Sequence, residues 1–140
     1  MDLYLPQPAP QDCEGDLHPM AVRGILLFNA GEYWHAHEAL EKAWLEEAGQ
    51  IRHLYRAILQ VGVTYFHIKK HNYAGALKIY SRSQRWLRPF PDECRGIDLA
   101  RLRSDLELVM AEVMQLGPNQ LDQFKLVLLR PIYHVEGNPW

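Results

Sequence analysis

The sequence predicts an all-α protein, an antiparallel up-and-down bundle of about five helices arranged as two helical hairpins plus a closing helix. Apolar residues recur at spacings of three and four in five successive segments, which is the period of an amphipathic helix. Residues that favour turns separate these segments. The chain has 140 residues, of which 48% are hydrophobic and 23% charged. A soluble single domain of this size can bury a core without further cross-links.

The first hairpin is expected to join helices at about 19–29 and 32–47. Pro19 suits a first helical position, where no backbone donor is needed. The run Asn29-Ala30-Gly31 predicts the turn, because Asn and Gly tolerate positive φ. Ala36 and Leu40 mark the apolar face of the second helix. Gly49 follows its last turn, as is common at helix ends.

The remaining helices are expected at about 51–70, 73–87 and 97–116. The third is apolar nearly all round, which is typical of a central helix. Gly62 inside it indicates the close approach of a neighbouring helix, since Gly otherwise costs about 1 kcal/mol there. The fourth ends before Pro89. The fifth has a continuous apolar seam, made of Leu99, Leu102, Leu106, Val109, Val113 and Leu116.

Three regions follow from this pattern. Residues 1–17 are expected to form an extended Pro-rich arm, 18–117 the helical bundle, and 118–140 a tail packing on the bundle. The tail is interpreted as extended, with a short sixth helix through Leu128 as the alternative. The segments GEYWHAHEAL at Gly31 and HNYAGALKIY at His71 form a weak repeat at an offset of 40. Two such units are too few for a solenoid, so they are interpreted as two packed hairpins.

Charge and cysteine content narrow the functional classes. The net charge of −2 gives no electrostatic case for a nucleic-acid partner or a membrane surface. The densest basic cluster, from Arg82 to Arg88, is interpreted as a solvated helix face. Cys13 and Cys94 lie far apart without CxxC spacing, which argues against a zinc ribbon and a disulfide framework. A cytoplasmic location is therefore expected, and neither a secretory signal nor a membrane-spanning stretch is seen.

The second helix carries the residues that are best suited to bind a ligand or to catalyse a reaction. His37 and Glu41 are four apart, and Glu38 lies three before Glu41, so these side chains are neighbours on one helix. A His and a carboxylate at this spacing can share a divalent cation, although HEALE is neither the Glu-x-x-His nor the His-Glu-x-x-His motif. The aromatic residues at helical spacing, Trp34, Trp44, Tyr55 and Tyr65, are interpreted as core rather than as a stacking platform.

The third helix carries a polar stripe that needs partners, because unpaired buried polar groups cost about 1–3 kcal/mol each. Arg56, Gln60 and His67 define this stripe. Counting outward from the turn at 48–50 places Arg56 nearest Glu41, Gln60 near His37 or Glu38, and His67 near the start of the second helix. A polar cluster between helices two and three is expected, made of His37, Glu38, Glu41, Arg56, Gln60 and His67.

Several functions of this cluster stay open. It is either a purely structural network or a pocket for a small ligand or a divalent metal, with His37, Glu41 and His67 as metal ligands. A third hypothesis is that the His37/Glu41 pair acts in general acid–base catalysis. No nucleophile motif, phosphate loop or cofactor fingerprint accompanies that pair, which disfavours an enzyme. A tetratricopeptide-like interaction scaffold is a further alternative, and a homo-oligomer is left open.

At these residues the sequence resembles the domain of unknown function 309 family of small helical proteins. The resemblance is carried by the run from Phe28 to Tyr33, by Ala36-His37-Glu38-x-Leu40-Glu41-x-x-Trp44, and by Leu59-Gln60, His67, Asn72 and Gly75-Ala76-Leu77. It extends over roughly 22–87 and implies an all-α bundle, with no activity attached. The family pattern usually has Gly before the Asn of the second turn, whereas this chain has His71, which puts a Gly-specific turn there in doubt.

Overall fold

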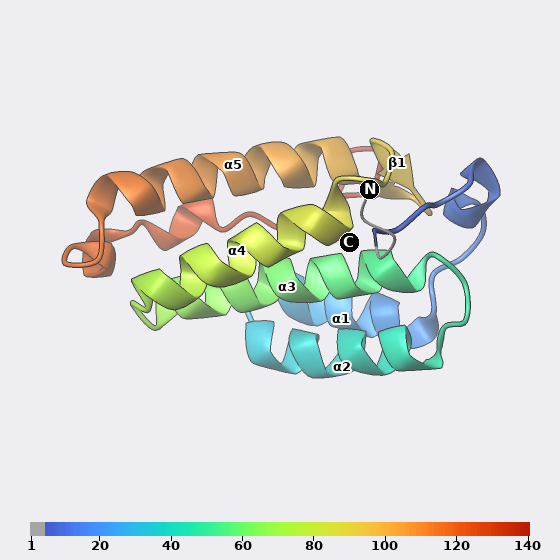
Figure 1. Cartoon of the computed structure of the whole chain (residues 1–140), viewed down its shortest axis with the longest axis horizontal. Helices are drawn as coiled ribbons and strands as arrows, with labels where there is room; N and C mark the ends of the chain where they lie inside the picture. The colour runs from blue at the N-terminus through green and yellow to red at the C-terminus, as the bar shows by residue number, and fades with distance from the viewer. Residues whose placement is uncertain (1–4) are drawn as a thin grey trace.

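The computed structural model describes residues 5–140, and five α-helices dominate it (Figure 1). The helices are α1 (Pro19–Asn29), α2 (Tyr33–Glu46), α3 (Arg52–Lys69), α4 (Tyr73–Leu87) and α5 (Leu99–Leu116). The all-α prediction is confirmed, and each helix begins and ends within two residues of its expected bounds. None of the helices in residues 5–140 is long and apolar enough to cross a membrane.

Successive helices pack side by side, α1 against α2, α2 against α3 and α3 against α4. Figure 1 shows α5 and α2 on opposite sides of the α3–α4 pair. The central position predicted for α3 is confirmed, because ten of its residues are buried. The apolar seam of α5 is also buried within this chain from Leu99 to Val113. That seam is therefore not an exposed surface on which a homodimer could form.

Two glycines allow close contact between neighbouring helices. A Cβ on Gly62 would lie 3.4 Å from Cδ2 of Phe28, so the approach predicted from this glycine is present at ordinary contact distance. The tighter approach is at Gly24 of α1, where a Cβ would lie 2.5 Å from Cγ of Leu40 on α2. The α1–α2 hairpin therefore depends on the absence of a side chain at Gly24.

The weak repeat corresponds to two similar turns. Gly31 follows α1 with φ +79°, and His71 follows α3 with φ 58°, so both residues adopt the left-handed region. In each case the next helix begins two residues later, at Tyr33 or Tyr73. The tight turn is thus retained although His71 stands where the family pattern has Gly, at the steric cost of a left-handed non-Gly residue.

The N-terminal arm departs from the extended form expected for it. It contains a 3-10 helix, η1 (Pro10–Cys13), and Cys13 forms a disulfide with Cys94, with Cα atoms 4.4 Å apart. Cys94 lies in a small hairpin that the sequence did not predict, made of β1 (Glu93–Cys94) and β2 (Ile97–Asp98). The cysteine spacing argued against a disulfide framework and did not predict this bond, because the fold joins segments that are distant in sequence. The cysteine spacing therefore no longer supports a reducing compartment.

The C-terminal tail is ordered by long-range hydrogen bonds. It forms two single-turn 3-10 helices, η2 (Leu121–Gln123) and η3 (Leu126–Leu128), in place of a sixth α-helix. Asn29, at the end of α1, donates from Nδ2 to the carbonyl of Ile132 and accepts from the Ile132 N–H at Oδ1. The tail also makes a β-bridge from His134 to Ile97. Asn29 was interpreted as a turn residue, whereas its side chain holds the tail against the bundle.

Candidate functional site

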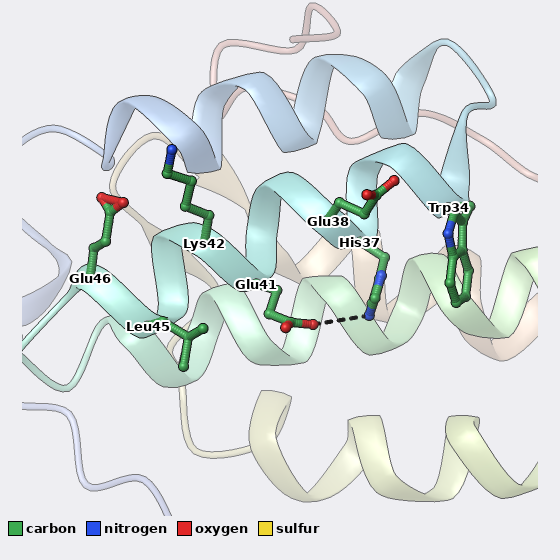
Figure 2. Close-up of a pocket in the computed structure, with 7 residues that line it drawn as sticks. All are labelled: Trp34, His37, Glu38, Glu41, Lys42, Leu45 and Glu46. Carbon is green, nitrogen blue, oxygen red and sulfur yellow. Dashed lines mark ion pairs between the residues drawn. The ribbon is translucent and has the colours of Figure 1, made fainter.

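The candidate site is the outer surface of α2. It contains a shallow depression of about 620 Å³ that is open to solvent (Figure 2). Every lining residue comes from this one helix, namely Trp34, His37, Glu38, Glu41, Lys42, Leu45 and Glu46. Three of the six residues predicted for the polar cluster therefore lie together here. Because α1 and α3 pack on the other sides of α2, its periodic polar residues are left facing outward.

His37 is held by two contacts within its own helix. Its ring stacks on that of Trp34, with centroids 4.7 Å apart, and its Nε2 lies 3.3 Å from a carboxylate oxygen of Glu41. Figure 2 shows the two side chains pointing toward each other from adjacent turns. His37 Nδ1 is buried and has no partner among residues 5–140. A carboxylate that orients an imidazole can serve proton transfer or hydrogen bonding to a ligand.

The other carboxylates of this surface also contact imidazoles. Glu38 lies 3.1 Å from Nδ1 of His35 on the same helix. Glu46 lies 3.1 Å from Nε2 of His18, which precedes α1. The three glutamates of the depression, Glu38, Glu41 and Glu46, outnumber its one lysine, Lys42. By the formal charges of these residues the surface is therefore acidic.

Two apolar side chains lie at opposite ends of the depression. Trp34 is 48% exposed and its ring lies 5.3 Å from that of Phe66 on α3. Leu45 is 71% exposed. The interpretation of Trp34 as a core residue was wrong, because it sits at the outer edge of the apolar face of α2. An apolar residue on an otherwise charged helix face is the signal that could have found both residues.

Arg56 does not join this cluster, and its predicted pairing with Glu41 was wrong. Its guanidinium lies over the rings of Trp44 on α2 and Trp86 on α4, 4.8 and 4.1 Å from their centroids. Its neighbour on α2 is thus three residues, about one helical turn, from the predicted one. Partial burial lowers the pKa of Arg56.

Gln60 and His67 also form no hydrogen bond or ion pair with His37 or Glu41 in residues 5–140. Gln60 Oε1 is buried without a hydrogen-bond partner in the described part of the chain, so the predicted bond to His37 is not formed. His67 Nδ1 lies 3.2 Å from Nδ2 of Asn72, whose Oδ1 accepts from the Gly75 N–H and caps α4. Burial lowers the pKa of His67. This histidine therefore supports a helix cap.

The geometry of these residues does not support the hypothesis of a divalent metal site. Within residues 5–140, no group of three or more His, Cys, Asp or Glu side chains is placed to hold one ion. His67 is engaged at Asn72, so the predicted triad of His37, Glu41 and His67 is not assembled. Only the pair of His37 and Glu41 remains, which supplies fewer ligands than protein metal sites commonly use.

The fold and the site together define a small helical protein built of two packed hairpins, with an acidic outer surface on its second helix. Residues 21–79 match the family model described as the domain of unknown function (DUF309). The resemblance seen in the sequence is confirmed over these residues. An "Uncharacterized protein" of Aquifex aeolicus (strain VF5) is 29% identical over 84 residues. That match covers 59% of this chain and 25% of the Aquifex protein, so the chain corresponds to part of a longer relative.

Proposed function

We propose that this protein is an interaction module, and that the outer surface of α2 binds a basic amphipathic helix of another protein. The observation that carries the proposal is the pairing of exposed Trp34 and Leu45 with the acidic residues between them. The two apolar residues are eleven positions apart, which corresponds to about 16 Å along a helix. A partner helix can place apolar residues against both ends and basic residues against Glu38 and Glu41.

The shape of the site favours a partner helix over a small substrate. All lining residues of the depression come from α2, so no opposing wall excludes water from His37 and Glu41. Acid–base catalysis gains most of its rate from a closed, preorganised site, which this surface does not supply. The matched region is 25% of the Aquifex protein, as is typical of a module combined with other segments. Location in the cytoplasm and homo-oligomerisation stay predictions from the sequence.

The test is selection from a displayed library of helical peptides on the immobilised full chain. We expect the enriched peptides to be basic and amphipathic. Their binding should fall at least about tenfold with Leu45→Glu, because the exchange puts a charge at an apolar contact. Leu108→Glu is the matched control, since Leu108 is 57% exposed on α5 and lies outside the proposed surface.

Two results would overturn the proposal. One is enrichment of peptides that bind the Leu45→Glu variant as well as the wild-type protein, because the surface used would then lie elsewhere. The other is enrichment of acidic peptides, which the carboxylates of α2 cannot favour. Circular dichroism of both variants serves as the fold check, since both replaced side chains are exposed.

A further inference from the structure

Charge is divided unevenly along the chain. Between Glu47 and Asp92 there is no Asp or Glu, so all 17 acidic residues lie outside this stretch. Eight of the 15 basic residues lie inside it, namely Arg52, Arg56, Lys69, Lys70, Lys78, Arg82, Arg85 and Arg88. The net charge of −2 is the sum over the whole chain and does not show this division. The expectation of no nucleic-acid partner rested on that sum.

The acid-free stretch is the α3–α4 hairpin, and α4 presents its cations to solvent. Lys78, Arg82, Arg85 and Arg88 are all exposed. They follow one another at steps of four, three and three, so they share one side of the helix with about one cation per 5.4 Å turn. A row of like charges on one surface produces a positive potential that attracts polyanions.

Three cations of this row have no carboxylate partner in the described part of the chain. The ion pairs of Arg103 with Asp92 and of Arg130 with Asp105 do not involve α3 or α4. Lys78, Arg82 and Arg88 have no carboxylate within ion-pair distance in residues 5–140. These three cations are therefore available to an external anion.

Arg56 of α3 places a guanidinium beside Trp86, near the C-terminal end of α4. The guanidinium lies over the rings of Trp44 and Trp86, and the ring of His53 stacks near Trp86 with centroids 5.5 Å apart. The N–H edge of Arg56 has no acceptor among the described residues. Contact with two indoles restricts this guanidinium, and the planar guanidinium fork matches phosphate oxygens in a bidentate manner.

The residue types on this face indicate which kind of polyanion it binds, a membrane surface or a nucleic acid. A membrane-binding helix needs apolar residues to enter the lipid. None of the large exposed apolar residues of the described chain belongs to α3 or α4; they are Leu5, Leu26, Trp34, Leu45, Leu108, Met114, Leu126 and Val127. Leu5, the least exposed of them at 37%, lines a depression beside Arg85 and Arg88. Five of the eight cations are Arg, the residue best suited to phosphate. We propose that the exposed side of α4, with Arg56 at its end, binds the phosphate backbone of a nucleic acid independently of sequence.

The test measures binding of the full chain to a labelled oligothymidine and to a labelled duplex of equal length by fluorescence anisotropy. We expect binding to at least one of them, with affinity falling steeply between about 50 and 200 mM salt as counterions are released. The variant Lys78→Glu/Arg82→Glu should bind at least about tenfold more weakly at low salt. Its salt slope should be smaller by about 1.4–1.8, the value for two lost phosphate contacts. The control Arg23→Glu/Lys125→Glu makes the same change of charge at exposed residues away from α4.

Equal losses in the two double variants would overturn the proposal, because net charge alone would then explain binding. No binding of the wild-type protein to either oligonucleotide at low salt would also overturn it. Binding to phosphatidylserine vesicles without binding to oligonucleotides would reassign the face to lipid. The nucleic-acid proposal is independent of the α2 surface, so Leu45→Glu should leave oligonucleotide affinity unchanged. Because every replaced residue is exposed, circular dichroism can verify that each variant keeps its fold.

Discussion

At the scale of single residues, His71 carries a backbone cost that the corresponding residue of the first hairpin avoids. Its φ is 58°, whereas Gly31 has φ +79° at the equivalent turn. A left-handed non-Gly residue costs about 1–2 kcal/mol, and the extra unfolded-state entropy of Gly offsets part of the gain. We expect His71→Gly to raise the free energy of unfolding by about 0.5–1 kcal/mol, measured by urea denaturation. His35→Gly, inside α2, should instead lower the free energy of unfolding by about 1 kcal/mol. Equal effects of the two variants would contradict the backbone cost proposed for His71.

The candidate site was predictable only where helical geometry alone fixes it. His37 and Glu41 meet because residues four apart are neighbours on any helix. The partner of Arg56 depends on how α2 packs against α3, which the periodicity within either helix does not determine. His67 looked like a metal ligand because its type and spacing fit one. Its bond to Asn72 depends on how the following turn closes.

At the scale of elements, the α1–α2 crossing depends on Gly24. A methyl group there would meet Cγ of Leu40 at 2.5 Å and the backbone oxygen of Ala36 at 3.3 Å. We expect Gly24→Ala to lower the free energy of unfolding by about 1–3 kcal/mol, as overpacking does in a buried contact. Gly62→Ala is the matched control, because its nearest neighbour would be Phe28 at 3.4 Å. Urea denaturation measures both, and a Gly24→Ala variant as stable as the wild-type protein would contradict the close-packed crossing.

Helices were predictable and the smaller elements were not, for a physical reason. A helix forms hydrogen bonds within one segment, so periodicity and turn residues locate it. The hairpin of β1 and β2 has strands of two residues, too short to show alternation. The course of the tail is set partly by Asn29, which is 103 positions from Ile132. Such contacts have no signature in the local sequence.

At the scale of the whole molecule, the helices separate two surfaces of opposite charge. The depression on α2 is lined by Glu38, Glu41 and Glu46, whereas α3 and α4 contain no acidic residue. The central helix α3 lies between α2 and α4 in the packing order, which keeps the acidic and basic surfaces on different elements. A module with this arrangement can hold a basic protein segment and a polyanion at the same time, because neither proposed partner needs the surface of the other.

The disulfide between Cys13 and Cys94 closes a long covalent loop, with a sequence separation of 81. It ties the N-terminal arm to the β1–β2 hairpin, where Arg95 also donates to the carbonyls of Asp12 and Asp16. Constraining so long a loop removes unfolded-state entropy, and typical disulfides contribute about 2–4 kcal/mol. We expect reduction to lower the free energy of unfolding by about that amount. The helices should persist, because the contacts among α1 to α4 do not involve the arm.

Urea denaturation with and without a phosphine reductant measures this loss, and a thiol assay verifies that the bond has been reduced. Cys13→Ser/Cys94→Ser is the control, and it should unfold at the midpoint of the reduced wild-type protein whether or not reductant is present. Equal midpoints for the oxidised and fully reduced wild-type protein would contradict the expected role of the disulfide. Loss of far-ultraviolet helicity on reduction would show instead that the bundle needs the arm, because the cross-link would then hold more than the two segments it joins.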